Sequence, residues 1–234
     1  IAPVSETTHA SYMSLLGGVA WVVQTRADIV VYVGYCQRGL KAPTVRHVKV
    51  LNRVLRYLKR VSMKLHFHHI EGDLRGIVIS DSAFKATDDD CLALKSGIIA
   101  LGSVDATNPG GRINVIDFLC KKHPRVNRST YAAELNTVLD LTSSAFLIFL
   151  CWTEAMTGVR TASEALTLHE LGQYAVPIEA VIDARAVFDS VTAREVKTPA
   201  DAILLLPALA LRELLDQKQL SRLWWVDTRD MLAD

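Results

Sequence analysis

Cysteine is scarce in this chain of 234 residues, and no two cysteines form a Cys-x-x-Cys pair. The four cysteines are Cys36, Cys91, Cys120 and Cys151. A zinc knuckle needs such pairs, and small disulfide-stabilised folds carry many more cysteines for their length. We therefore interpret the four residues as buried thiols in a reducing compartment. This interpretation predicts an intracellular protein of the cytoplasm or the nucleus.

Long hydrophobic runs are also missing. The longest run, from Ala145 to Trp152, is far shorter than the roughly 20 residues that a membrane-spanning helix needs. The next richest stretch is interrupted by Pro207, and the first residues lack the basic and apolar regions of a signal peptide. We therefore expect no membrane partner. Apolar residues nevertheless make up 50% of the chain, which favours a globular protein with a large core.

Acidic residues are absent between Asp28 and Glu71, although the whole chain is nearly neutral. A solvated helix face would carry charges of both signs, whereas a block of one sign suggests a polyanion as partner. We therefore favour nucleic acid over a merely solvated face. The candidate binding residues recur at helical spacing and are Arg46, Lys49, Arg53, Arg56 and Arg60. Histidines of the same stretch alternate with Leu65 and Phe67, as in a strand, and share no Cys or acid spacing typical of a metal site.

Apolar periodicity divides the chain into a helical start and a mixed remainder. The apolar composition of residues 12–35 predicts one or two buried helices. Apolar residues that recur three and four positions apart predict a helix over 43–60. From residue 71 the order changes to strand, strand, strand, helix, strand, helix, helix, strand. These elements are expected at 76–81, 96–101, 112–120, 130–156, 178–182, 184–192, within 199–217, and at 223–226. The order predicts an α/β fold with a mixed five-stranded sheet and helices packed on its faces.

Four acids lie at the ends of these predicted elements. Asp81 closes the first strand, Glu134 lies in the first turns of the long helix, Asp183 closes the fourth strand, and Asp234 follows the fifth. Strand ends meet at one edge of an α/β sheet, where sites are common. Clustered carboxylates repel one another unless cations neutralise them, and hard oxygen ligands favour Mg²⁺ or Mn²⁺. Each acid also has a simpler interpretation, because Asp183 could cap a helix and Glu134 could lie on a solvated face.

Several sequence blocks repeat the pattern of one known family. They are Tyr12-x-Ser14-Leu15-x-Gly17, Thr25-Arg26-Ala27-Asp28-Ile29, Arg53-Val54-Leu55-Arg56-Tyr57-Leu58-Lys59, Ser80-Asp81-Ser82-Ala83-Phe84, Tyr131-Ala132-Ala133-Glu134-Leu135, Ile182-Asp183-Ala184 and Trp225-Val226-Asp227-Thr228-Arg229-Asp230-Met231-Leu232-Ala233-Asp234. With these blocks the chain resembles the C-terminal part of the polyprotein of copia-type LTR retrotransposons. That part comprises the tail of the reverse transcriptase and its ribonuclease H domain. The resemblance runs essentially from end to end.

The resemblance implies a division of the chain and a set of ligands. Residues 1–70 would be the helical tail of the reverse transcriptase, and residues 71–234 a ribonuclease H-like domain truncated at its C-terminus. Asp81, Glu134, Asp183 and Asp234 would be the metal ligands and catalytic residues for two Mg²⁺ or Mn²⁺ ions. The chain departs from the family at Ala184-Arg185, where Asn-Gln is usual, and it lacks the paired-Asp motif of the polymerase.

The implied activity is metal-dependent endonucleolytic cleavage of the RNA strand of an RNA–DNA hybrid. Lys121, Lys122 and Arg128 precede the long helix and would hold the hybrid backbone. The other expected partner is the remainder of the polyprotein. Two alternatives stay open. One is a catalytically inactive relic that acts as a nucleic-acid-binding or structural module, and the other is an unrelated interaction domain.

Overall fold

The chain folds into two compact units. The computed structural model describes residues 3–84, 93–104, 111–124, 126–158, 161–195 and 198–233. One unit comprises residues 1–66 with 119–121, and the other comprises residues 67–118 with 122–234. Asp234 and Cys91 lie outside the described residues.

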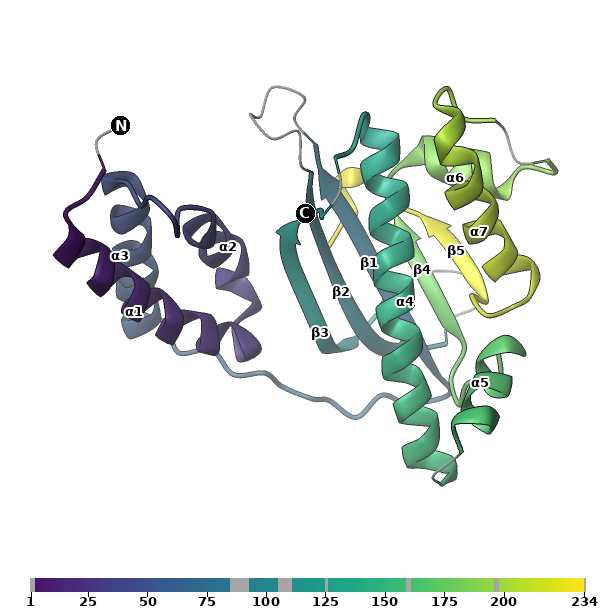
Figure 1. Cartoon of the computed structure of the whole chain (residues 1–234). Helices are drawn as coiled ribbons and strands as arrows, with labels where there is room; N and C mark the ends of the chain where they lie inside the picture. The colour runs from purple at the N-terminus through teal and green to yellow at the C-terminus, as the bar shows by residue number, and fades with distance from the viewer. Residues whose placement is uncertain are drawn as a thin grey trace. The chain divides into compact units, whose positions relative to one another are not determined.

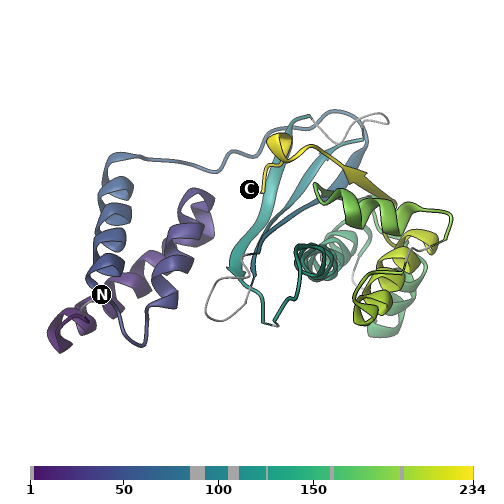
Figure 2. The same cartoon turned by 90° about the horizontal axis from the view of Figure 1, so that it is seen from above.

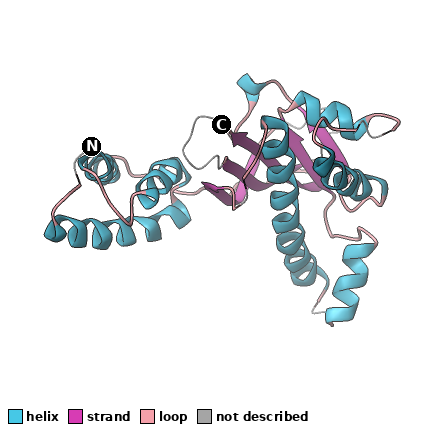
Figure 3. Ribbon diagram, turned by 45° about the horizontal axis from the view of Figure 1, so that its top comes forward, coloured by secondary structure: helices cyan, strands magenta, loops and turns pink. Residues whose placement is uncertain are grey.

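The first unit is helical, and Figure 3 shows no strand within residues 3–66. Its core contains Tyr12, Leu16, Val33, Cys36 and Leu51. The Tyr12 hydroxyl donates a 2.7 Å hydrogen bond to the Cys36 carbonyl and so joins the first two helices. The helices are α1 (Glu6–Val22), α2 (Val30–Arg38) and α3 (Val45–Arg60), with 3₁₀ turns at Val23–Thr25 and Ala27–Ile29. One or two helices were predicted before the basic helix, and the structure has two, α1 and α2.

The second unit contains a five-stranded mixed sheet with the strand order β3-β2-β1-β4-β5. Strand β1 pairs antiparallel with β2 and parallel with β4, and β4 pairs parallel with β5. The strands are β1 (Leu74–Ala83), β2 (Leu94–Ser103), β3 (Ile113–Lys122), β4 (Ile178–Ile182) and β5 (Arg222–Trp225). The predicted α/β class is confirmed, and this arrangement matches the description of a ribonuclease H-like fold.

Helices cover one side of this sheet. Figures 1 and 2 show α4, α6 and α7 on the same side, with α4 along β1. The helices are α4 (Thr130–Thr157), α5 (Ala162–Glu170), α6 (Arg185–Thr192) and α7 (Leu205–Asp216). Ile77, Ile79 and Val181 form a second apolar cluster with Met231, which follows β5. The segment after β5 thus supplies part of the apolar packing.

Two glycines in the sheet let α4 lie close to it. A Cβ atom at Gly97 would come within 2.2 Å of a Leu141 methyl, and one at Gly76 within 2.5 Å of the Phe149 ring. Both positions therefore need a residue without a side chain. Since α4 also carries Glu134, this close packing sets how near that carboxylate comes to the strands.

The structure corrects three local predictions. β1 continues to Ala83, two residues beyond Asp81, because β2 pairs with it through Lys95 and Leu94. The alternating stretch 65–69 is not a strand but an exposed segment without regular structure. Cys151 is exposed on the outer face of α4, whereas Cys36 and Cys120 are buried as predicted. Helix α5 was not predicted.

Helix α4 is the one described helix whose length and composition would allow it to cross a membrane. Core helices of globular proteins pass the same test. Here the apolar residues of α4 include Leu135, Val138, Leu141 and Phe149, which are buried in the fold.

Candidate metal centre

Three carboxylates converge at one end of the sheet. Oxygen atoms of Asp81, Glu134 and Asp183 all lie within 4.8 Å of one another. Asp81 lies in β1, Asp183 directly follows β4, and Glu134 lies in the second turn of α4. Strands β1 and β4 run parallel as neighbours, so their carboxyl ends meet at the same edge. The chain segments that carry these acids are about 50 residues apart, and only folding brings them together.

Glu134 is the most buried of the three acids, with 9% of its surface exposed. Its Oε1 accepts a 3.2 Å hydrogen bond from the backbone N–H of Ser82. Its Oε2 is buried and has no hydrogen-bond partner among the residues that the structure describes. Burial, followed by the charges of Asp81 and Asp183, raises the pKa of Glu134 to about 8. The interpretation of Glu134 as a solvated helix-face residue is therefore wrong.

Asp183 is oriented by the segment that follows β5. Its Oδ2 accepts a 2.7 Å hydrogen bond from the Thr228 hydroxyl. Its backbone carbonyl accepts a 2.8 Å hydrogen bond from the Trp225 indole N–H. The N-cap of α6 is Ala184, with no side-chain capping bond. Asp183 is thus not a helix cap, and its carboxylate points toward the other acids.

A pocket of about 290 Å³ opens beside these carboxylates. Glu134, Asp183 and Thr228 line it together with Tyr131 and the first residues of α6. Arg185 also lines it, and its guanidinium lies 4.8 Å from the Trp225 ring centroid and 2.9 Å from an Asp189 oxygen. The side chain of Arg185 is therefore supported from two sides at the edge of the pocket.

The donor set suits a hard divalent cation. All three groups offer carboxylate oxygens, which Mg²⁺ and Mn²⁺ prefer. In the described part of the chain, no ion pair joins Glu134 or Asp183 to a basic side chain. The unpartnered Oε2 of Glu134 is a buried oxygen that a cation would satisfy. The three residues could therefore hold a metal ion.

The remaining predicted residues lie elsewhere. Asp234 falls outside the described residues, so its position relative to the three acids stays a prediction. Arg128 is exposed and lies 3.9 Å from Asp201, Lys121 is exposed, and Lys122 is half-buried. None of the predicted nucleic-acid-binding residues is among the described residues that line the pocket. The nucleic-acid-binding residues predicted on α3 are all exposed, and they are Arg46, Lys49, Arg53, Arg56 and Arg60.

Four residues that contact the site acids or line the pocket beside them were not singled out from the sequence. They are Ser82, Arg185, Trp225 and Thr228. Trp225 and Thr228 belong to the same sequence block as Asp234, so that block contained a usable signal. Ser82 acts through its backbone N–H, which any residue except proline would provide, so side-chain chemistry could not reveal it.

Comparison with protein-family models gave no match to this chain, and comparison with curated proteins gave none either. Support for a function therefore comes from the arrangement of the carboxylates and from the sequence blocks around them.

Proposed function

We propose that this chain is a ribonuclease H-type endonuclease that uses divalent metal ions to cleave the RNA strand of RNA–DNA hybrids. The observation that carries the proposal is the convergence of Asp81, Glu134 and Asp183 within 4.8 Å at one edge of the sheet. These are three of the four acids that the family resemblance selects as metal ligands.

Asp81, Glu134 and Asp183 would hold Mg²⁺ or Mn²⁺, with Asp234 as the fourth ligand. Two bound ions would supply an activated water on one side of the phosphodiester and neutralise the leaving oxygen on the other. The rest of the site positions these ligands. Thr228 orients the Asp183 carboxylate, and the Ser82 N–H orients that of Glu134.

The proposed substrate follows from charge and shape. Exposed basic residues on α3, together with Lys121, Lys122 and Arg128, would bind phosphates without reading sequence. Hybrid selectivity would come from backbone shape and 2′-hydroxyl contacts. The family's Asn-Gln pair is absent here, and Arg185 lies in its place at the pocket edge. We propose that the chain belongs to the C-terminal part of a copia-type retrotransposon polyprotein.

The decisive experiment is cleavage of a labelled RNA–DNA hybrid with Mg²⁺ or Mn²⁺. We expect Asp81→Asn to lower the rate by more than about a hundredfold, because loss of outer-shell partners alone costs 10–100-fold in such sites. Asp216→Asn is the matched control, since Asp216 pairs with Arg212 on the surface of α7. Asp216→Asn should retain full activity. EDTA should abolish cleavage by the wild type and by Asp216→Asn.

Cleavage that persists in Asp81→Asn would refute the proposed site. Hybrid binding without cleavage, in a wild-type chain that remains folded by circular dichroism, would instead favour the inactive relic. A double-stranded DNA of the same sequence serves as the substrate control, and its cleavage at an equal rate would contradict the hybrid specificity.

A further inference from the structure

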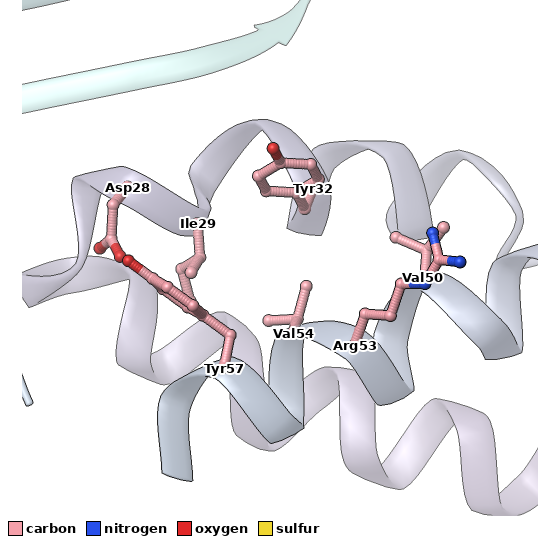
Figure 4. A pocket seen from close by; sticks show the side chains of 7 residues that line it. All are labelled: Asp28, Ile29, Tyr32, Val50, Arg53, Val54 and Tyr57. Carbon is pink, nitrogen blue, oxygen red and sulfur yellow. The ribbon is translucent and has the colours of Figure 1, made fainter. Parts of the chain in front are cut away.

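A second pocket lies within the helical unit, between α2 and α3. Its volume is about 460 Å³, larger than the pocket beside the carboxylates. Figure 4 shows Tyr32 on α2 opposite Val54, Tyr57 and Arg53 on α3. The complete lining is Asp28, Ile29, Tyr32, Val50, Arg53, Val54 and Tyr57. It is thus an aromatic and aliphatic pocket with a basic residue on one side.

Both tyrosines are accessible, and one of them has charged neighbours beside its ring and its hydroxyl. Tyr32 is 55% exposed and Tyr57 is 39% exposed. The Tyr57 hydroxyl faces the Asp28 carboxylate, which raises the pKa of this hydroxyl, and the Arg26 guanidinium lies 5.4 Å from the ring centroid. These neighbours limit how the ring can turn, so it loses less entropy than a free ring when a planar ligand stacks on it.

The acid of this pocket is already neutralised. Arg26 donates two 2.8 Å hydrogen bonds to the two oxygens of Asp28 and a third, of 2.9 Å, to the Val61 carbonyl. The hydrogen bonds from Arg26 are the main cause of a lowered pKa of Asp28. Asp28 is therefore an anion paired with Arg26, and it does not make the pocket acidic.

The rim of the pocket continues into a strip of positive charge on α3. Arg53 lines the pocket, and Arg46 and Arg60 lie seven residues to either side of it, on the same helix face. Lys49 and Arg56 fill the positions between them, and none of the five forms an ion pair among the described residues. Residues 1–66 as a whole hold ten Lys or Arg but two Asp or Glu.

We propose that this pocket binds a base of single-stranded nucleic acid, with the adjoining phosphates along the basic face of α3. A base has an apolar planar surface that stacks on aromatic rings, and its phosphates need cations nearby. An apolar peptide would suit the tyrosines but would gain nothing from the five unpaired cations. This site goes beyond hybrid cleavage and rests on none of the three carboxylates.

Fluorescence anisotropy with a labelled oligothymidylate of about 12 nucleotides, added to the full chain, tests the proposal. Removing a stacking ring costs roughly tenfold or more in affinity, so Tyr32→Ala should weaken binding by about this factor. Tyr32→Phe keeps the ring and should bind as tightly as the wild type. Trp21→Ala is the matched control, because Trp21 is 74% exposed on α1 and does not line the pocket.

The salt dependence separates stacking from charge. Tyr32→Ala should leave the slope of log Kd against log salt unchanged, whereas Arg53→Gln should reduce it by about 0.7. An abasic oligonucleotide with the same backbone should bind the wild type and Tyr32→Ala equally well. Thermal unfolding should be unchanged in Tyr32→Ala, because the side chain is largely exposed.

The proposal is overturned if Tyr32→Ala, still folded, binds the oligothymidylate as tightly as the wild type. The basic face would then act alone, and an apolar protein segment would be the better occupant of the pocket. Asp81→Asn should bind the oligothymidylate normally. Failure of the nuclease proposal would therefore leave this test intact, and failure here would leave the nuclease proposal intact.

Discussion

A glutamate is buried at each end of the sheet, but one lies beside a positive charge and the other beside negative charges. At one end Glu179 of β4 accepts a 2.8 Å hydrogen bond from Arg75 of β1 and another of 2.8 Å from the Trp224 indole. At the other end Glu134 faces Asp81 and Asp183. Both glutamates have less than a tenth of their surface exposed. Neighbouring groups, rather than burial, therefore account for the difference between the ends.

The comparison separates a structural charge from a candidate binding charge. The Arg75–Glu179 pair joins β1 to β4 across the parallel ladder and is internally neutral. The carboxylate cluster has no such counter-charge for Glu134 or Asp183 among the described residues, so without a cation Glu134 keeps a proton up to a pH of about 8. Perturbed ionisable groups are concentrated at functional sites, which makes this end of the sheet the candidate binding site.

The largest expected effect on stability comes from removing the negative charge of Glu179, which leaves Arg75 without its ion pair. Glu179→Gln leaves the buried Arg75 guanidinium without its carboxylate and should lower the free energy of unfolding by about 3–5 kcal/mol. Urea denaturation followed by circular dichroism measures the change. The double variant Arg75→Met, Glu179→Met should recover much of the loss, because it removes both charges. A Glu179→Gln protein as stable as the wild type would show that the pair is not structural.

A glutamate-to-glutamine substitution at Glu134 should instead raise the free energy of unfolding at high pH. The pKa of Glu134 is about 8 in the folded chain, against 4.5 for an ordinary glutamate side chain. The folded chain therefore keeps a proton that the unfolded chain loses, and stability falls as pH rises through this window. The expected slope is about 1.4 kcal/mol per pH unit without metal. Glu134→Gln is always neutral and should lose this slope, so it should be more stable than the wild type at pH 8.

Thermal unfolding between pH 5 and pH 8 in EDTA measures the slope for both proteins. Added Mn²⁺ should stabilise the wild type more at the higher pH, because the ion replaces the proton on the carboxylates. A wild-type stability that stays flat with pH, or rises, would mean that Glu134 is charged and satisfied without metal.

The smallest expected effect concerns the hydrogen bond to Asp183. Thr228→Val removes the hydroxyl that orients this carboxylate while keeping nearly the same shape. We expect metal affinity to fall about tenfold and stability to change by about 1 kcal/mol or less. Titration calorimetry with Mn²⁺ measures the affinity. Thr192→Val is the control, because the exposed Thr192 hydroxyl donates only to the Phe188 carbonyl within α6. Equal affinities in the two variants would show that Thr228 does not support the site.

Much of the fold could be predicted because local patterns and packing agree. The 3.6-residue periodicity gave α3, and a predicted helix at 130–156 corresponds to α4 at Thr130–Thr157. The patterns failed where the deciding contact was distant. β1 extends past Asp81 because Lys95 and Leu94 continue the ladder, and no local signal at Ser82 or Ala83 reports that pairing. Helix α5 has no buried residues and therefore little apolar periodicity to detect.

In the candidate site, too, local sequence patterns predicted some features and distant contacts decided the others. Asp81, Glu134 and Asp183 could be selected from the sequence, because strand-end acids and a family pattern mark them. Their simpler interpretations were equally consistent with the sequence, since capping, solvation and metal binding use the same carboxylate.

The amino-acid sequence by itself determined the order of the elements, the acids at their ends and the positive charge of residues 29–70, because these depend on neighbours along the chain. Tertiary structure alone decided that Glu134 is buried beside two other carboxylates while Glu179 is paired with Arg75. The parallel alignment of β1 with β4 and the close approach of α4 over Gly76 and Gly97 place those groups. The energy of a charge depends on what lies a few ångströms away in space, whatever the separation along the chain.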